Sequence, residues 1–148
     1  MQLKMLRIRD VKLPERVGRN AGFDFFVPED QKGIVLKPGK SCNIPSGIKV
    51  RLEPNRALIA FNKSGIASKY GLQVGACVVD ENYTGEIHLN MQNCSKANYY
   101  IDPGRKIVQF LYIRVGYADV VECFTEKEMY EGFDIQERGD QGFGSTGL

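Results

Sequence analysis

A glycine-rich segment at the carboxyl end of the sequence carries residue types that suit a phosphorylated ligand. It reads Arg138-Gly139-Asp140-Gln141-Gly142-Phe143-Gly144-Ser145-Thr146-Gly147. Glycines let a backbone approach a phosphate and direct N–H groups at it, while Arg138 adds a planar, permanent charge. Ser145 and Thr146 add hydroxyl donors, and the Phe143 ring can stack on a base. A flexible terminus has the same composition, so the assignment needs support from the rest of the chain.

A second segment of this kind lies between residues 74 and 86, where an apolar run leads into a polar turn. Asp80 and Glu81 are adjacent carboxylates, and Tyr83 and Gly85 follow them. A carboxylate at the rim of a hairpin can accept a proton from water, and a tyrosine ring can form an apolar floor for a sugar. A solvated turn accounts equally well for the segment taken alone.

Three further segments place polar side chains where they need partners. Asp24 lies among aromatic residues, so its carboxylate must be paired, hydrated or near a metal, unless it only forms a turn. Residues 62–68 follow a strand and open a helical turn, which is the geometry of an anion site, although Ser64 is also a good helix cap. Gln109 lies midway along an apolar strand, and a buried amide needs structural partners or a ligand.

Short runs of β-branched and aromatic residues recur between turn signals such as Pro38-Gly39 and Pro45-Ser46-Gly47, which predicts many short strands. The expected strands are 23–27, 33–36, 47–52, 57–61, 72–79, 86–92, 106–115 and 118–124. Two short helices are expected, one near residues 64–70 and one opened by the capping box Thr125-Glu126-Lys127-Glu128. The pattern predicts an all-β sandwich, jelly roll or barrel.

Composition limits the class of protein. A chain of 148 residues can bury one sizeable core, so we expect a single domain over residues 1–148. No run approaches the roughly 18 apolar residues of a membrane span, and the start lacks the apolar core of a signal peptide, which predicts a soluble, cytoplasmic protein. The net charge of +2 divides into 14 Lys/Arg against 6 Asp/Glu in residues 1–74, and 6 against 12 in residues 75–148. Neither half has the basic, aromatic-interleaved stripe of a nucleic-acid binder.

The cysteines and the single histidine give little support to metal or histidine chemistry. Cys42, Cys77, Cys94 and Cys123 lack the spacing of a zinc site, which favours reduced, mostly buried thiols. His88 lies in an alternating run and is expected to be an ordinary strand residue. The segment after Tyr130 loses the strand pattern, so residues 132–148 are expected to form a mobile arm until something binds.

Taken in order, the five polar segments resemble the five motifs of the homotrimeric deoxyuridine triphosphatases (dUTP diphosphatases), and they span residues 21 to 147. The resemblance implies a jelly-roll fold, a homotrimer with active sites between subunits, and an arm that closes a site. It also implies hydrolysis of dUTP to dUMP and diphosphate with Mg²⁺, with no nucleic-acid or membrane partner. Such a hydrolase limits uracil incorporation into DNA and supplies dUMP for thymidylate synthesis.

The resemblance also implies a role for individual residues. Asp80 would activate the water that attacks the α-phosphorus, and Tyr83 would lie under the deoxyribose and exclude a 2′-hydroxyl. The backbone of Gly75, Cys77, Val78 and Val79 would pair with uracil. Asp24 would help to hold magnesium through water, the ion being chelated mainly by the phosphates. The remaining substrate-binding residues would be Lys63, Ser64, Gly65, Gln109, Arg138, Phe143, Gly144, Ser145 and Thr146.

Several positions depart from the family pattern. Lys63 stands where arginine is usual, which keeps the charge but loses bidentate geometry. Cys77 and Gln141 stand where glycine is usual, and Arg105-Lys106 replaces an Asp-Arg pair.

Two other functions remain open from the sequence. A dCTP deaminase shares the fold, but the Asp80–Tyr83 hairpin argues against it. A regulatory protein of this fold could bind partners through the acidic segment 122–137.

Overall fold

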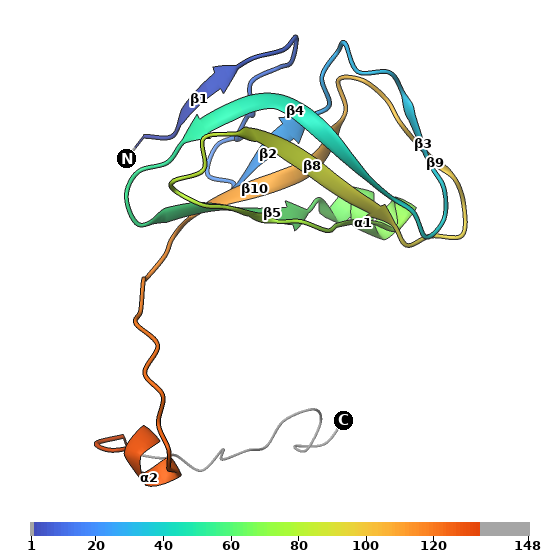
Figure 1. Cartoon of the computed structure of the whole chain (residues 1–148). Coiled ribbons are helices and arrows are strands. Elements are labelled where there is room, and N and C mark those ends of the chain that lie inside the picture. The colour runs from blue at the N-terminus through green and yellow to red at the C-terminus, as the bar shows by residue number, and fades with distance from the viewer. Residues whose placement is uncertain (1, 134–148) are drawn as a thin grey trace. The chain divides into compact units, whose positions relative to one another are not determined.

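Turn residues divide the chain into short strands, as the sequence pattern predicts. The computed structural model describes residues 2–133 (Figure 1), and its contacts divide the chain into two units, Met1–Gly116 and Tyr117–Leu148. The first unit holds ten strands and one helix among its described residues: β1 (Lys4–Arg7), β2 (Gly22–Phe26), β3 (Ile34–Leu36), β4 (Ser41–Arg51), β5 (Arg56–Asn62), α1 (Ser64–Tyr70), β6 (Leu72–Val74), β7 (Val78–Val79), β8 (Glu86–Asn93), β9 (Tyr99–Ile101) and β10 (Lys106–Arg114). The second unit holds α2 (Glu126–Met129).

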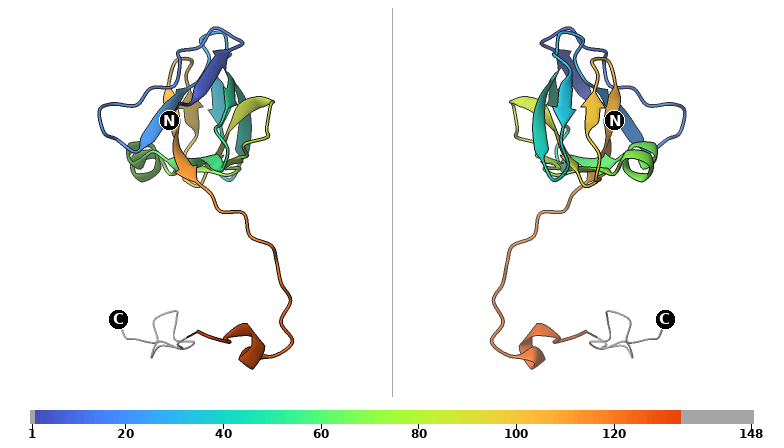
Figure 2. Two further views of the ribbon diagram at one scale, coloured as in Figure 1. Left: turned by 90° about the vertical axis from the view of Figure 1, so that its left-hand side faces the viewer. Right: turned by 90° about the vertical axis from the view of Figure 1, so that its right-hand side faces the viewer.

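Antiparallel ladders join these strands into three sheets. Their orders are β1-β4-β8-β6, β2-β10-β5-β7 and β3-β9. β4 and β8 cross over β10 and β5 in the first unit (Figures 1 and 2), and apolar side chains from both sheets fill the space between them. Phe25 and Phe110, with ring centroids 4.5 Å apart, lie in this core with Ile44 and Leu89. The all-β jelly-roll prediction with two short helices is confirmed.

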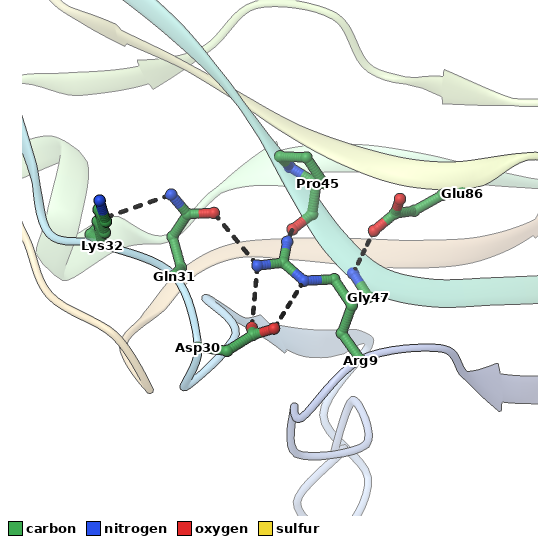
Figure 3. A network of polar contacts seen from close by, with 7 residues as sticks. All are labelled: Arg9, Asp30, Gln31, Lys32, Pro45, Gly47 and Glu86. Atoms are coloured by element: carbon green, nitrogen blue, oxygen red, sulfur yellow. Dashed lines mark hydrogen bonds and ion pairs between the residues drawn. The ribbon is translucent and has the colours of Figure 1, made fainter.

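β4 is longer than expected because the predicted turn at Pro45-Ser46-Gly47 lies inside it. The register with β8 shifts between Pro45 and Lys49, and Gly47 has a φ of +72°, a conformation that favours glycine. The Gly47 N–H donates to the Glu86 carboxylate at 2.7 Å, and the Arg9 guanidinium donates to the Pro45 carbonyl at 3.2 Å (Figure 3). Arg9 is itself paired with Asp30 at 2.9 Å. These contacts hold the strand through its irregular turn, so β4 continues instead of ending.

Two other strand predictions are wrong. The run 72–79 is not one strand: β6 pairs with β8 and β7 pairs with β5, so the chain changes sheets at residues 75–77. The run 118–124 forms no strand. β1 and β9 were not predicted, since one is largely charged and exposed and the other is only three residues long.

Both helix predictions are confirmed. α1 ends at Gly71, which has a φ of +65°. At α2 the Thr125 hydroxyl accepts the Glu128 N–H at 3.1 Å, which is the first bond of the expected capping box. The Glu128 carboxylate accepts the N–H of Phe124 at 3.0 Å, one residue before the Thr125 N–H that a capping box would use. Within residues 2–133, neither helix is long and apolar enough to cross a membrane.

The four cysteines are free, as expected, but they are not mostly buried. Cys77, Cys94 and Cys123 are exposed, and Cys42 is half-buried. Burial raises the pKa of the Cys42 thiol. The exposed cysteines lie at the sheet change, after β8 and in the segment before α2, where no second layer covers them.

Candidate active site

Three adjacent strands bring Asp24, Gln109 and the end of β5 together. On β10, Gln109 lies opposite Asp24 of β2 on one side and Phe61 of β5 on the other. Asp24, Lys63 and Gln109 line a cavity of about 530 Å³, and an adjoining cavity of about 280 Å³ is lined by Lys63, Ser64, Gly65, Ile66, Lys106 and Gln109. These two cavities are called the first hollow below. It gathers residues as far apart in the sequence as Glu15 and Leu111.

The charged groups of the first hollow form one network. The Lys63 amine pairs with the Asp24 carboxylate, and Lys106 pairs with Glu15 and lies 3.6 Å from the second Asp24 oxygen. The hydrogen bond from Lys106 lowers the pKa of Glu15, and the same contact raises the pKa of Lys106. Glu15 had no signal in the sequence that singled it out. Two lysines therefore stand beside an aspartate that the resemblance assigns to magnesium.

The start of α1 supplies main-chain donors to the first hollow. Lys63 is the residue at the helix cap, and its carbonyl accepts the N–H groups of Ile66 at 3.0 Å and Ala67 at 2.9 Å. The N–H groups of Ser64 and Gly65 make no hydrogen bond to another described residue. The structure shows no side-chain capping bond here, so the alternative of Ser64 as a cap is wrong. Two N–H groups and a hydroxyl thus remain for an anion, next to the Lys63 amine that pairs with Asp24.

A second hollow, of about 260 Å³, lies at the hairpin that follows the sheet change. Its lining includes Cys77, Val78, Val79 and Tyr83, together with His88 of β8. β7 pairs Val78 and Val79 with β5, and the Cys77 carbonyl accepts the Ala60 N–H at 2.7 Å. The expected nucleobase residues therefore share one hollow, except that Gly75 lies before it. His88 is a strand residue, as expected, with Nδ1 at 3.0 Å from the Glu86 carbonyl oxygen.

A tight turn positions Asp80 and Tyr83 beside the second hollow. The Tyr83 N–H donates to the Asp80 carbonyl at 3.1 Å, and the Tyr83 hydroxyl donates to the Glu86 carbonyl at 2.8 Å. Gly85 is required under the ring, because a Cβ there would lie 2.4 Å from the hydroxyl oxygen. The exposed Asp80 carboxylate has no ion pair or hydrogen bond to another described residue. It is free to take a proton from water.

The donor set of the first hollow suits a magnesium ion held mainly by its ligand. Among residues 2–133, no group of three or more His, Cys, Asp or Glu side chains could hold a metal ion. Mg²⁺ keeps several waters and commonly binds through one or two carboxylates plus substrate phosphates. The single, partly exposed Asp24 carboxylate fits such a water-mediated contact once Lys63 and Lys106, which face its two oxygens, turn toward the phosphates. The predicted role of Asp24 is compatible with this geometry and stays a prediction.

The predicted residues fall into two hollows rather than one. Asp24, Lys63, Ser64, Gly65 and Gln109 meet at the first hollow, and the uracil and sugar residues meet at the second. Arg138, Phe143, Gly144, Ser145 and Thr146 lie outside the described residues, as does the Gln141 departure. Sequence reasoning missed Asn62 and Asn90, which hydrogen-bond the hairpin main chain, because a single asparagine on a strand carries no distinctive signal.

The chain is similar to proteins of known family. The family model described as dUTPase matches residues 11–147. The chain is 31% identical over 144 residues to the Pol polyprotein of equine infectious anemia virus (strain Wyoming), covering 97% of this chain but 12% of the polyprotein. It is 30% identical over 158 residues to the deoxyuridine 5′-triphosphate nucleotidohydrolase of Escherichia coli O1:K1 / APEC, covering 97% of this chain and 99% of that enzyme.

Solved structures show the same fold. A variant of the Staphylococcus bacteriophage 80alpha dUTPase with dUpNHpp superposes with a TM-score of 0.84 at 20% identity, covering 99% of each chain. A phage phi11 dUTPase variant, whose structure describes the coordination of a structural Mg(II) ion, gives a TM-score of 0.75 at 20% identity over 86% of this chain and 99% of that one. With a family match over residues 11–147 and a relationship along almost the whole bacterial enzyme, the chain belongs to the dUTPase family.

Proposed function

We propose that this protein is a dUTP diphosphatase, which hydrolyses dUTP to dUMP and diphosphate with Mg²⁺. The observation that carries the proposal is the free Asp80 carboxylate beside Tyr83, at a hollow built from the hairpin main chain, in a member of the dUTPase family. The E. coli relative is named a deoxyuridine 5′-triphosphate nucleotidohydrolase, and the 80alpha enzyme is solved with dUpNHpp. The reaction keeps dUTP away from DNA synthesis and supplies dUMP.

In this proposal the second hollow selects the nucleoside. The main chain from Gly75 to Val79 pairs with uracil, and the Tyr83 ring lies under the deoxyribose and leaves no space for a 2′-hydroxyl. Asp80 takes a proton from the water that attacks the α-phosphorus. Selectivity then rests on shape and main-chain hydrogen bonds, which the strand pairing of Val78 and Val79 holds in place.

The first hollow binds the phosphates. Lys63, the N–H groups of Ser64 and Gly65, and the Gln109 amide supply positive charge and donors. Asp24 holds magnesium through water. When bound, the ion neutralises phosphate charge that builds up during hydrolysis. Because Lys63 and Lys106 already pair with carboxylates, an incoming phosphate group competes with Asp24 and Glu15 for these lysines.

We infer that the active site is shared between copies of the chain in a homotrimer. The residues assigned to phosphate and to nucleoside line different hollows of one chain, and a site shared between subunits gives each hollow a complementary partner. The whole of residues 1–148 acts as one dUTPase-like domain in this view. Residues 132–148 form its arm, in which Arg138, Gly144, Ser145 and Thr146 contact the phosphates and Phe143 stacks on uracil.

We place the reaction in the cytoplasm. Four free cysteines, three of them exposed, suit a reducing compartment. Fractionation of the native host cell, followed by detection of the chain, checks this placement. Recovery with an oxidising compartment would contradict it.

Release of diphosphate from dUTP, dTTP, dCTP and UTP in the presence of Mg²⁺ tests the proposed reaction. We expect release that is selective for dUTP. Release of ammonia from dCTP would instead support a deaminase. Binding of dUTP without turnover would support a regulatory protein of this fold.

A further inference from the structure

Two asparagine side chains hold the main chain at the point where it changes sheets. The Val74 N–H donates to the Asn62 Oδ1 at 2.7 Å, and the Ala76 N–H donates to the Asn90 Oδ1 at 3.1 Å. Between them, the Gly75 N–H donates to the Asn90 main-chain carbonyl at 3.2 Å. Three successive N–H groups are thereby satisfied at the end of the ladder between β6 and β8, whose last pair is Val74 and Met91.

Close packing at Gly75 fixes the position of the Asn90 side chain. A Cβ on residue 75 would lie 2.0 Å from the Asn90 Oδ1 and 2.8 Å from the Gln92 Nε2. The amide group therefore lies directly against the backbone of Gly75, and only glycine leaves this space. The next residues along the chain, 76–79, line the second hollow. The Asn90 amide therefore contacts the start of the hairpin that carries residues 76–79, called the nucleobase hairpin below.

Asn62 also connects this hairpin with the first hollow. Its side chain accepts the Val74 N–H, while its main-chain carbonyl accepts the Gln109 Nε2 at 2.8 Å. Gln109 lines both cavities of the first hollow, and the residue after Asn62 is Lys63, which pairs with Asp24. One residue at the end of β5 thus contacts groups of both hollows.

We propose that Asn62 and Asn90 are positioning residues that clamp residues 74–76 and so set the position of the nucleobase hairpin, with Asn62 also tying that hairpin to Gln109. The role in nucleotide selection rests on the proposed function. Each asparagine acts through the main chain it holds. Losing an acceptor leaves an N–H without its partner and lets the hairpin move, which weakens the fit of the base.

Leucine and aspartate variants test the clamp directly. Asn62→Leu and Asn90→Leu remove the acceptor at similar volume, and Asn90→Asp keeps it. Amide hydrogen exchange should speed up at Val74 in Asn62→Leu and at Ala76 in Asn90→Leu, and stay slow at Ala76 in Asn90→Asp. Asn98→Leu, at an exposed position with no side-chain hydrogen bond to a described residue, is the control and should leave both amides unchanged. Unchanged exchange in folded leucine variants would overturn the clamp.

Steady-state kinetics test the consequence for substrate. The leucine variants should raise KM for dUTP several-fold, the size expected from the net loss of one hydrogen bond at an exposed position, and should lower the preference for dUTP over dCTP. Binding of diphosphate alone to Asn90→Leu should be unchanged. Asn90→Asp, which keeps the acceptor, should have the KM of the native chain. An unchanged KM and preference would overturn the positioning role. If the native chain turned over no dUTP, the proposed function would fail, while amide exchange would still decide whether the clamp exists.

Discussion

At the scale of single residues, the Asp80 carboxylate differs from the other acids of the site because it has no partner among the described residues. Asp24 and Glu15 are each tied to lysine, whereas Asp80 is exposed next to the turn that holds Tyr83. The oxygens of the Asp24 carboxylate face lysine amines, whereas the Asp80 carboxylate is open to a water molecule. This contrast supports the proposal that Asp80 takes the proton and that Asp24 serves binding.

Replacing Asp80 with Asn should remove the proposed base while keeping its shape. We expect kcat to fall about 10²- to 10⁴-fold, the usual contribution of a positioned base, with little change in the affinity for a non-hydrolysable dUTP analogue. Quenched-flow or continuous diphosphate assays measure the rate, and calorimetry measures the binding. Glu81→Asn is the neighbouring control. Comparable losses in both variants would mean that the turn, and not the Asp80 carboxylate, matters.

The Glu15–Lys106 pair should add a pH dependence to folding. The pKa of Glu15 is lowered from 4.5 by Lys106, so the pair stabilises the fold above the unfolded pKa and loses this effect as pH falls through the folded value. The raised pKa of Lys106 makes the stabilisation disappear again as pH rises through that folded value, above 10.5. Glu15→Gln should therefore show a smaller loss of Tm on acidification below pH 4.5 than the native chain.

Thermal melts between neutral and acidic pH measure this difference. Both side chains are partly exposed, so the effect is small and is reduced further by salt. Glu29→Gln, at an exposed position, serves as the control. Identical acid sensitivity of the native and Glu15→Gln chains would show that the pair does not contribute.

At the scale of elements, the hairpin depends on close approaches that only glycine permits. Gly75→Ala should displace either the Asn90 amide or the hairpin, because the new Cβ would lie 2.0 Å from the Asn90 Oδ1. We expect a several-fold rise in KM for dUTP and a loss of stability of about 1–3 kcal/mol, the usual cost of overpacking. Gly116→Ala is the matched control, since nothing lies within 4 Å of its Cβ. Urea denaturation and kinetics measure both effects, and equal behaviour of the two variants would contradict the account.

The elements also show what could be predicted from the sequence. Alternation and turn residues located most strands and both helices, and the ordered polar segments located the hairpin. The apolar run at residues 72–79 could not reveal that the chain changes sheets, because an apolar strand has the same sequence character in either sheet. Residues 118–124 have a strand pattern but no strand, since pairing depends on a neighbour that the sequence does not name.

The sequence named several residues that the structure brings together, but it did not predict their contacts. The five segments placed Asp24, Lys63 and Gln109 near one another, and the structure brings them to the first hollow. The pairing of both lysines with carboxylates, and the role of Asn62, arise from side chains that meet only after folding. Such contacts have no spacing along the chain that could reveal them.

At the scale of the whole molecule, an active site built from two copies of the chain can be distinguished from a site within one chain. Asp80→Asn chains and chains ending at Glu137 should each be inactive alone. Co-assembled mixtures should recover part of the native rate, because some sites then combine an intact Asp80 with an intact arm from another chain. Light scattering should give a mass three times the 16.6 kDa of the chain. A monomer mass with no recovery on mixing would contradict the shared site.

The most direct test of the central claim is diphosphate release from dUTP, dTTP, dCTP and UTP with Mg²⁺, comparing the native chain with one that ends at Glu137. The account predicts release from dUTP far above the other three nucleotides, and its collapse on truncation, because the missing arm carries Arg138 and Phe143. Absence of release from dUTP by the native trimer, or equal release from all four nucleotides, would contradict it.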